Sequence, residues 1–173
     1  MAFRLTDGEI VIRNAVPQDQ AVVERLVRET DCSLMAYGTE PGRIHVYHGR
    51  EQFFPEKIEA SKLYRLMLEN STAEPVGYIG LKVTSEEYRR AELSYFVADR
   101  YKGHGYATRA LQLLTEFAFD RLTMKRLYLE IADGNIPSLR VAEKCGYQKE
   151  GLLLSFKLIG KKWHDYWLLA RIH

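Results

Sequence analysis

The chain has 173 residues, of which 46% are hydrophobic and 12% aromatic, a composition typical of a globular protein and not of a disordered one. Its 25 Lys and Arg residues against 23 Asp and Glu residues leave a formal charge of +2, which disfavours a general nucleic-acid binder. The sequence has no apolar run of signal-peptide or membrane-span length, so we expect a cytoplasmic protein with a single domain over residues 1–173.

The first third of the chain predicts one strand and one helix. The strand covers Glu9–Ala15, and Pro17 opens a helix whose apolar stripe is formed by Val22, Val23, Leu26 and Val27. The segment 31–55 is irregular and rich in Gly, Tyr and His. Three strands follow, and the third is too apolar on both faces for an exposed edge; their ranges are Lys62–Glu69, Val76–Val83 and Ala91–Ala98.

The last third predicts two helices and three further strands. A helix follows Gly105, with its apolar side on the core and Thr108, Gln112, Thr115 and Glu116 facing away. A strand over Arg126–Ala132 precedes a short helix that Asn135 caps and Gly146 ends. Strands over 147–156 and 162–172 complete an α+β fold, a mixed central sheet of about seven strands flanked by helices.

The cysteines and histidines do not predict a metal or thiol site. Cys32 and Cys145 are far apart and match no metal-ligand spacing, so we expect free thiols, with Cys145 a small core residue at a helix end. His45 and His48 are three residues apart, but no nearby carboxylate or cysteine completes a zinc site. We therefore expect no metal.

The segment "DRYKGHGYATRAL" (Asp99–Leu111) places two glycines among basic residues just before a helix. Lys102, His104 and Arg109 bring side-chain charge of the sign that an anion requires. Such a segment is either a plain loop between strand and helix or an anion site, because small residues and a helix N-terminus let main-chain N–H groups approach a phosphate. The P-loop pattern is absent. The dinucleotide fingerprint fails as well, since Thr108 replaces its third glycine and the loop follows the fourth strand.

The residues around this loop carry a family resemblance. "KGHGYA" (Lys102–Ala107) resembles the Q/R-x-x-G-x-G/A loop of the GNAT superfamily of acyl-CoA-dependent N-acyltransferases. The preceding "LSYFVADRY" resembles the fourth strand of the family, and "NIPSLRVAEKCGY" its N-x-x-S/A-x-x-x-x-E-K-x-G-F/Y segment. The resemblance runs from Glu9 to Ile172 and is closest to the branch of ribosomal-protein N-terminal alanine and serine acetyltransferases.

The resemblance implies a sheet splayed between its fourth and fifth strands, with acetyl-CoA entering the gap as acyl donor. The main-chain N–H of Val97 would polarise the thioester carbonyl. The implied acetyl-CoA-binding residues are Phe96, Val97, Ala98, Lys102, Gly103, His104, Gly105, Tyr106, Ala107, Thr108, Asn135 and Ser138. Lys102 stands where Gln or Arg is usual, Arg109 replaces a Glu, and Ala142 replaces a tyrosine that protonates the leaving thiolate in other branches.

Two residues are candidates for the chemistry. Glu92, at the head of the fourth strand, is either a base acting directly or through water, or a solvated strand-end carboxylate. Ser138 is either an ordinary first-turn helix residue or, with no tyrosine at Ala142, the acid or hydrogen-bond donor to sulfur. The aromatic residues of the strands are mostly expected in the core, with one or two lining the acceptor pocket.

The sequence thus favours an acetyl-CoA-dependent N-acetyltransferase that works by direct attack in a ternary complex. The acceptor is a protein N-terminal amine, a polyamine or an aminoglycoside, and the segment 31–55, with Asp31 and Glu40, is expected to shape its pocket. A non-catalytic acyl-CoA-binding sensor is the alternative. The resemblance also implies a homodimer, which nothing in the residues themselves requires, and neither a nucleic acid nor a membrane is an expected partner.

Overall fold

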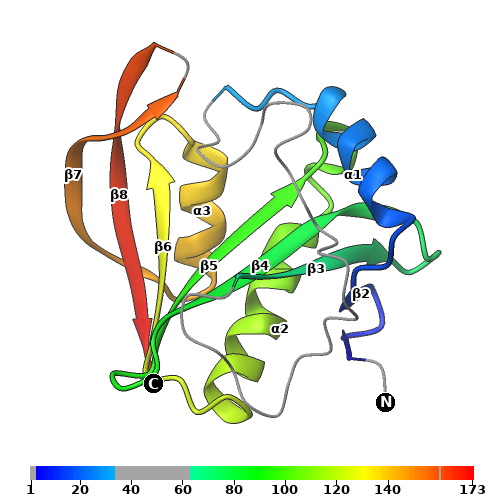
Figure 1. Cartoon of the computed structure of the whole chain (residues 1–173), viewed down its shortest axis with the longest axis horizontal. Coiled ribbons are helices and arrows are strands. Elements are labelled where there is room, and N and C mark those ends of the chain that lie inside the picture. Colours follow the sequence, from blue (N-terminus) through cyan, green and yellow to red (C-terminus); the bar gives the residue numbers. More distant parts are fainter. Residues whose placement is uncertain (1–2, 34–62, 160) are drawn as a thin grey trace.

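The structure, a computed structural model, describes residues 3–33, 63–159 and 161–173, which form one twisted mixed sheet with helices on both faces (Figure 1). The strands run in the spatial order β1-β2-β3-β4-β5-β6-β8-β7. Their bounds are β1 (Arg4–Thr6), β2 (Ile10–Asn14), β3 (Leu63–Asn70), β4 (Pro75–Ser85), β5 (Arg90–Val97), β6 (Arg126–Ala132), β7 (Gln148–Ile159) and β8 (Lys162–Ile172).

This architecture confirms the predicted α+β class and adds one strand to the expected seven. The additional strand is β1, which pairs antiparallel with β2. Its three residues are too few to show a hydrophobic period, so the sequence pattern could not reveal it. Most of the expected segment 31–55, with Glu40, His45 and His48, lies outside the described residues.

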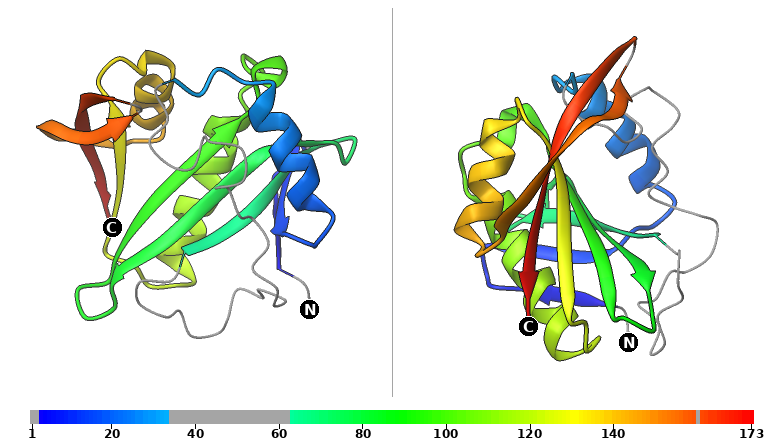
Figure 2. Two further views of the ribbon diagram at one scale, coloured as in Figure 1. Left: turned by 45° about the horizontal axis from the view of Figure 1, so that its top comes forward. Right: turned by 90° about the vertical axis from the view of Figure 1, so that its left-hand side faces the viewer.

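The helices lie on opposite faces of the sheet (Figure 2). Helix α1 (Asp19–Arg28) packs Val23, Leu26 and Val27 against one face, in a cluster that includes Met67 and Phe96. Helices α2 (Tyr106–Asp120) and α3 (Ile136–Lys144) cover the other face, where the larger core cluster lies. Both faces of the central strands are therefore buried, which explains why β5 is apolar on each side.

Helix α2 departs from its predicted polar face at one position. Thr115 was expected to face away from the core, but its side chain is fully buried and its Oγ1 lies 2.7 Å from the Tyr147 hydroxyl. A hydroxyl can be buried at little cost when it finds such a partner, and a helical period cannot reveal a partner from a distant segment.

The feature that positions the site is a gap between β5 and β6. These strands are the one parallel pair among the described residues, and they pair only from Arg90↔Arg126 to Glu92↔Tyr128. Beyond Glu92, β5 stays with β4 whereas β6 stays with β8, so the two strands diverge (Figure 1). This is the predicted splay, and helix α3 follows directly from the far end of β6.

Candidate active site

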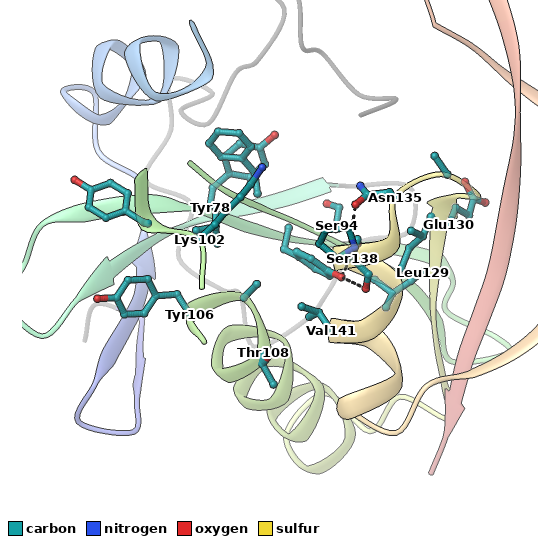
Figure 3. A pocket seen from close by; sticks show the side chains of 18 of the residues that line it. Tyr78, Ser94, Lys102, Tyr106, Thr108, Leu129, Glu130, Asn135, Ser138 and Val141 are labelled. Carbon is teal, nitrogen blue, oxygen red and sulfur yellow. Dashed lines mark hydrogen bonds between the residues drawn. The ribbon is translucent and has the colours of Figure 1, made fainter. Parts of the chain in front are cut away.

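A cavity of about 920 Å³ occupies the gap between the diverging strands. It is lined from β5, β6, the loop before α2 and the first turns of α2 and α3, as Figure 3 shows. Its size falls within the usual range for small-molecule sites, about 300–1,000 Å³. The cavity thus lies where two sheet halves and two helix N-termini meet.

One end of the cavity is suited to an anion. Gly103 and Gly105 line it with left-handed φ values of +83° and +79°, and an added Cβ at either would point into open space. Gly105 is the N-cap of α2, whose first turn holds no acidic residue. The first N–H groups of a helix lack intrahelical partners, so the lining residues Tyr106, Ala107 and Thr108 offer main-chain donors at the positive end of α2.

The three basic side chains near this loop make different contacts, and only one of them lines the cavity. Lys102 lines the cavity, with its ammonium on the carboxylate of Asp99 at the surface. His104 does not line it; its ring stacks on Tyr106 with centroids 5.5 Å apart. Arg109, expected to contribute charge to the anion, instead bonds Asp7 at 2.8 Å. Of these three, Lys102 is therefore the side chain that can approach a bound phosphate.

The middle of the cavity is bordered by the end of β5. The N–H of Ala98 bonds the carbonyl of Val76 in β4 at 3.0 Å. Successive N–H groups of a strand point to opposite sides, so the N–H of Val97 points toward the gap. Val97 and Phe96 line the cavity, whereas Ala98 does not. A strand N–H facing an open gap is a suitable donor for a carbonyl oxygen.

The opposite wall is the first turn of α3. Asn135 caps the helix, as predicted, by accepting a 3.2 Å bond from the N–H of Ser138. The Ser138 side chain lines the cavity (Figure 3). Its Oγ lies 2.7 Å from the hydroxyl of Tyr95. Ala142 is fully buried in the core one turn later. Ser138 is therefore the hydroxyl of α3 that borders the cavity.

The other end of the cavity is lined by carboxylates and cations. Glu92 is half-buried, and burial, followed by the nearby charge of Glu130, raises its pKa. Glu130 is held 2.7 Å from the Lys157 ammonium. Lys82 lies opposite Glu92 on β4 and also lines the cavity. A carboxylate with a raised pKa at a cavity wall is suited to accept a proton.

Most of the residues predicted for the site come together in this cavity. The predicted residues that line it are Glu92, Phe96, Val97, Lys102, Gly103, Gly105, Tyr106, Ala107, Thr108, Asn135 and Ser138. Ala98 and His104 do not line it. Sequence reasoning placed no site role on Glu130, Lys144 or Arg65, which line it too. These three residues come from β6, α3 and β3, and local sequence patterns do not show which elements meet at one cavity.

The cysteines, the possible metal ligands and the helix lengths can also be compared with the sequence-based expectations. Cys145 is buried directly after α3, as expected, and Cys32 is a free thiol. The described residues hold no cluster of three metal-ligating side chains. Within the same residues, no helix has the length and apolar character needed to cross a membrane.

Comparison with known proteins connects this geometry to a family. The acetyltransferase (GNAT) domain family matches residues 9–148. The putative ribosomal N-acetyltransferase YdaF of Bacillus subtilis is 28% identical over 94% of this chain and 92% of its own length. The uncharacterized N-acetyltransferase p20 of Bacillus licheniformis is 31% identical over 50% of this chain, and the spermidine N(1)-acetyltransferase of Vibrio cholerae 24% identical over 66%. This chain spans only 48% of p20 and 66% of the spermidine enzyme, less than two thirds of either.

Solved structures share the fold. A putative ribosomal-protein-serine acetyltransferase from Vibrio cholerae superimposes with a TM-score of 0.75 at 19% identity, over 99% of this chain and 98% of that one. RimJ of Mycobacterium smegmatis, in complex with CoA-disulfide, gives a TM-score of 0.75 at 22% identity, over 99% of this chain and 86% of that one. At these identities the structures establish the fold.

Proposed function

The chain belongs to the GNAT acetyltransferase family, and from this premise we propose that it transfers the acetyl group of acetyl-CoA to a primary amine. The single observation that carries the proposal is one cavity that joins an anion site to a proton acceptor. The first turn of α2 lies at one end, Glu92 at the other, and the gap between β5 and β6 connects them.

The anion site suits the pyrophosphate of acetyl-CoA. The main-chain N–H groups at the start of α2, with Lys102 beside them, hold the phosphates, and Gly105 leaves room for their close approach. The pantetheine arm then extends through the gap, where the N–H of Val97 donates to the thioester oxygen. Asn135 and Ser138 border the same passage from α3. These contacts orient the donor before the reaction.

The transfer itself needs a neutral amine and a stabilised thiolate. Glu92, directly or through a water molecule, takes a proton from the amine, whose lone pair then attacks the thioester carbon. The N–H of Val97 stabilises the negative charge on oxygen. The attacking nitrogen then gives its extra proton to solvent, and the C–S bond breaks as the amide forms. The Ser138 hydroxyl donates a hydrogen bond to the departing sulfur, and solvent supplies the proton that completes the CoA thiol.

The acceptor we favour is a protein N-terminal amine, as in a ribosomal protein. The YdaF alignment, which spans nearly the whole of both chains, supports it. A polyamine is the second candidate, because Glu92, Glu130 and Asp31 all line the cavity and would attract a cation. Arg65 and Lys82 line the same cavity, and their charge opposes a polycation.

Turnover of acetyl-CoA tests the proposal. Purified protein is incubated with acetyl-CoA and a panel of amines: peptides with N-terminal alanine or serine, spermidine and an aminoglycoside. Release of free thiol is measured, and mass spectrometry of the acceptor locates the acetyl group. We expect turnover with at least one amine, and most with a peptide. Binding of acetyl-CoA without turnover of any amine would favour the alternative, a non-catalytic acyl-CoA sensor.

A further inference from the structure

The hydroxyl of Tyr95 meets Ser138 at two atoms. It donates to the main-chain carbonyl of Ser138 at 3.0 Å and lies 2.7 Å from Ser138 Oγ, where either oxygen can be the donor. Tyr95 belongs to β5 and Ser138 to α3, so these contacts span the space beside the cavity. Both side chains line that cavity. No sequence motif pointed to Tyr95 for this role.

Both partners are held in place independently of each other. The ring of Tyr95 packs against the larger core cluster, and its strand pairs with β4 at Ile79. Ser138 lies in the first turn of α3, where its N–H is bonded to the side chain of Asn135. Oxygen atoms fixed in this way can change hydrogen-bond partners by rotating O–H groups, without movement of the backbone.

Each of the two hydroxyls has one proton, so each can donate only one hydrogen bond at a time. If Tyr95 donates to the Ser138 carbonyl, the seryl proton fills the short contact between the two hydroxyls, and it then points to the oxygen of Tyr95. If Tyr95 donates to Ser138 Oγ, the seryl proton is released to point toward a sulfur atom. In this second arrangement the Ser138 carbonyl loses the hydrogen bond from Tyr95. It still has a donor, because helical geometry gives it the N–H of Ala142 in α3.

We propose that Tyr95 is a positioning residue that turns the Ser138 hydroxyl into a donor for the departing thiolate. This inference rests on the proposed function, because it needs a thioester sulfur beside Ser138. As negative charge develops on sulfur, the Tyr95 proton moves from the carbonyl to Ser138 Oγ by rotation about its C–O bond, and the seryl proton turns to sulfur. No proton leaves either oxygen. Tyr95 acts through Ser138 and needs no contact with the substrate.

The burial of Tyr95 supports its role as a donor to Ser138, because burial raises the pKa of the phenol and keeps it protonated. A phenol of this kind is a poor proton source but a permanent hydrogen-bond donor. A donor that strengthens a second donor is expected to act mainly in the transition state, where the sulfur carries its charge.

The test is Tyr95→Phe, which keeps the ring and removes the hydroxyl. We expect kcat to fall about tenfold, with KM for acetyl-CoA within about twofold of the parent. Tyr147→Phe is the matched control, because it removes a similar 2.7 Å bond to Thr115 in a pair that does not line the cavity. It should leave kcat unchanged. In a Ser138→Ala background, Tyr95→Phe should cost nothing further. A parent-like kcat in Tyr95→Phe, or an equal further loss in that background, would overturn the inference.

A second measurement does not depend on an acceptor. The pKa of the thiol of bound CoA is followed by its thiolate absorbance against pH, for the parent and for Tyr95→Phe and Ser138→Ala. A hydrogen bond to the thiolate lowers this pKa, and we expect each variant to raise it by about one pH unit relative to the parent. Equal thiol pKa values in the parent and Tyr95→Phe would overturn the inference even in a protein that turns over no amine. Failure of the parent to bind CoA would overturn both proposals.

Discussion

Glu92 and Glu130 line the same cavity from neighbouring strands whose pairing ends at Glu92, and burial together with the charge of Glu130 raises the pKa of Glu92. The first prediction follows from this pair. Glu92→Gln should lower kcat by about a hundredfold to ten-thousandfold, the range for a lost general base. In the parent, the acidic limb of kcat against pH should have its midpoint above 4.5, the ordinary value for this carboxyl.

Glu130→Gln gives the matched control for this limb. Removing the neighbouring negative charge should lower the pKa of Glu92, so the midpoint should move to lower pH while kcat at neutral pH changes little. An acidic limb that remains unchanged in Glu92→Gln would assign the titration to another group.

The second prediction concerns stability. Because the pKa of Glu92 in the folded protein lies above its unfolded value, the folded state binds more protons between the two values. Ionisation of Glu92 therefore destabilises the fold, and this destabilisation develops as pH rises through that window. The melting temperature of Glu92→Gln minus that of the parent should therefore increase as pH rises from 4 to 7. A difference that is constant with pH would contradict the raised pKa.

The sequence predicted the elements well, because each depends on a local pattern. The strand Arg126–Ala132 and the strand 162–172 have their predicted bounds, and Asn135 caps its helix through the expected side-chain oxygen. The local pattern of the glycine loop leaves a plain loop and an anion site open, and the family resemblance favours the anion site. Its glycines, basic neighbours and following helix are contiguous, and the structure places most of them at one cavity.

The rest of the site depends on contacts between distant segments. Tyr95 reaches Ser138 across 43 positions of sequence, and Arg109 is bonded to Asp7, 102 positions away. Neither pairing follows from a period or a motif. The sequence therefore predicts Tyr95 among the strand aromatics expected mostly in the core, and Arg109 as a positive charge near a bound anion. The homodimer, the cytoplasmic location, the single-domain boundary and the acceptor stay predictions.

The third prediction concerns the ion pair that holds α1. Asp19 is buried, accepts two bonds from Arg13 at 2.7 and 2.9 Å, and also accepts the N–H of Val16 at 2.7 Å. Asp19→Ala leaves the N–H of Val16 without its acceptor, whereas Arg13 keeps the carboxylate of Glu69, 2.7 Å from its Nε. The loss should be about 1.5–3 kcal/mol of unfolding free energy and roughly 5–10 °C in Tm. Thermal melting measures this loss.

Glu150→Ala is the comparison for this ion pair. The Glu150 side chain is 36% exposed, against 5% for Asp19, so less than about 1 kcal/mol should be lost. Neither Asp19 nor Glu150 lines the cavity, so both variants should keep the parent kcat at 25 °C. Equal loss of stability in the two variants would contradict the special role of the buried pair.

The fourth prediction separates close approach to phosphate from backbone strain. Gly105→Val puts a side chain into the open space beside the first turn of α2, at φ +79°. Losing two charge-assisted bonds to phosphate should weaken acetyl-CoA binding by about a hundredfold or more. Gly8→Val has comparable strain, at φ +93°, but does not line the cavity, so it should bind like the parent. Titration calorimetry measures both. If Gly105→Val binds acetyl-CoA like the parent, the phosphates lie elsewhere, and if Gly8→Val weakens binding as much, strain is the cause.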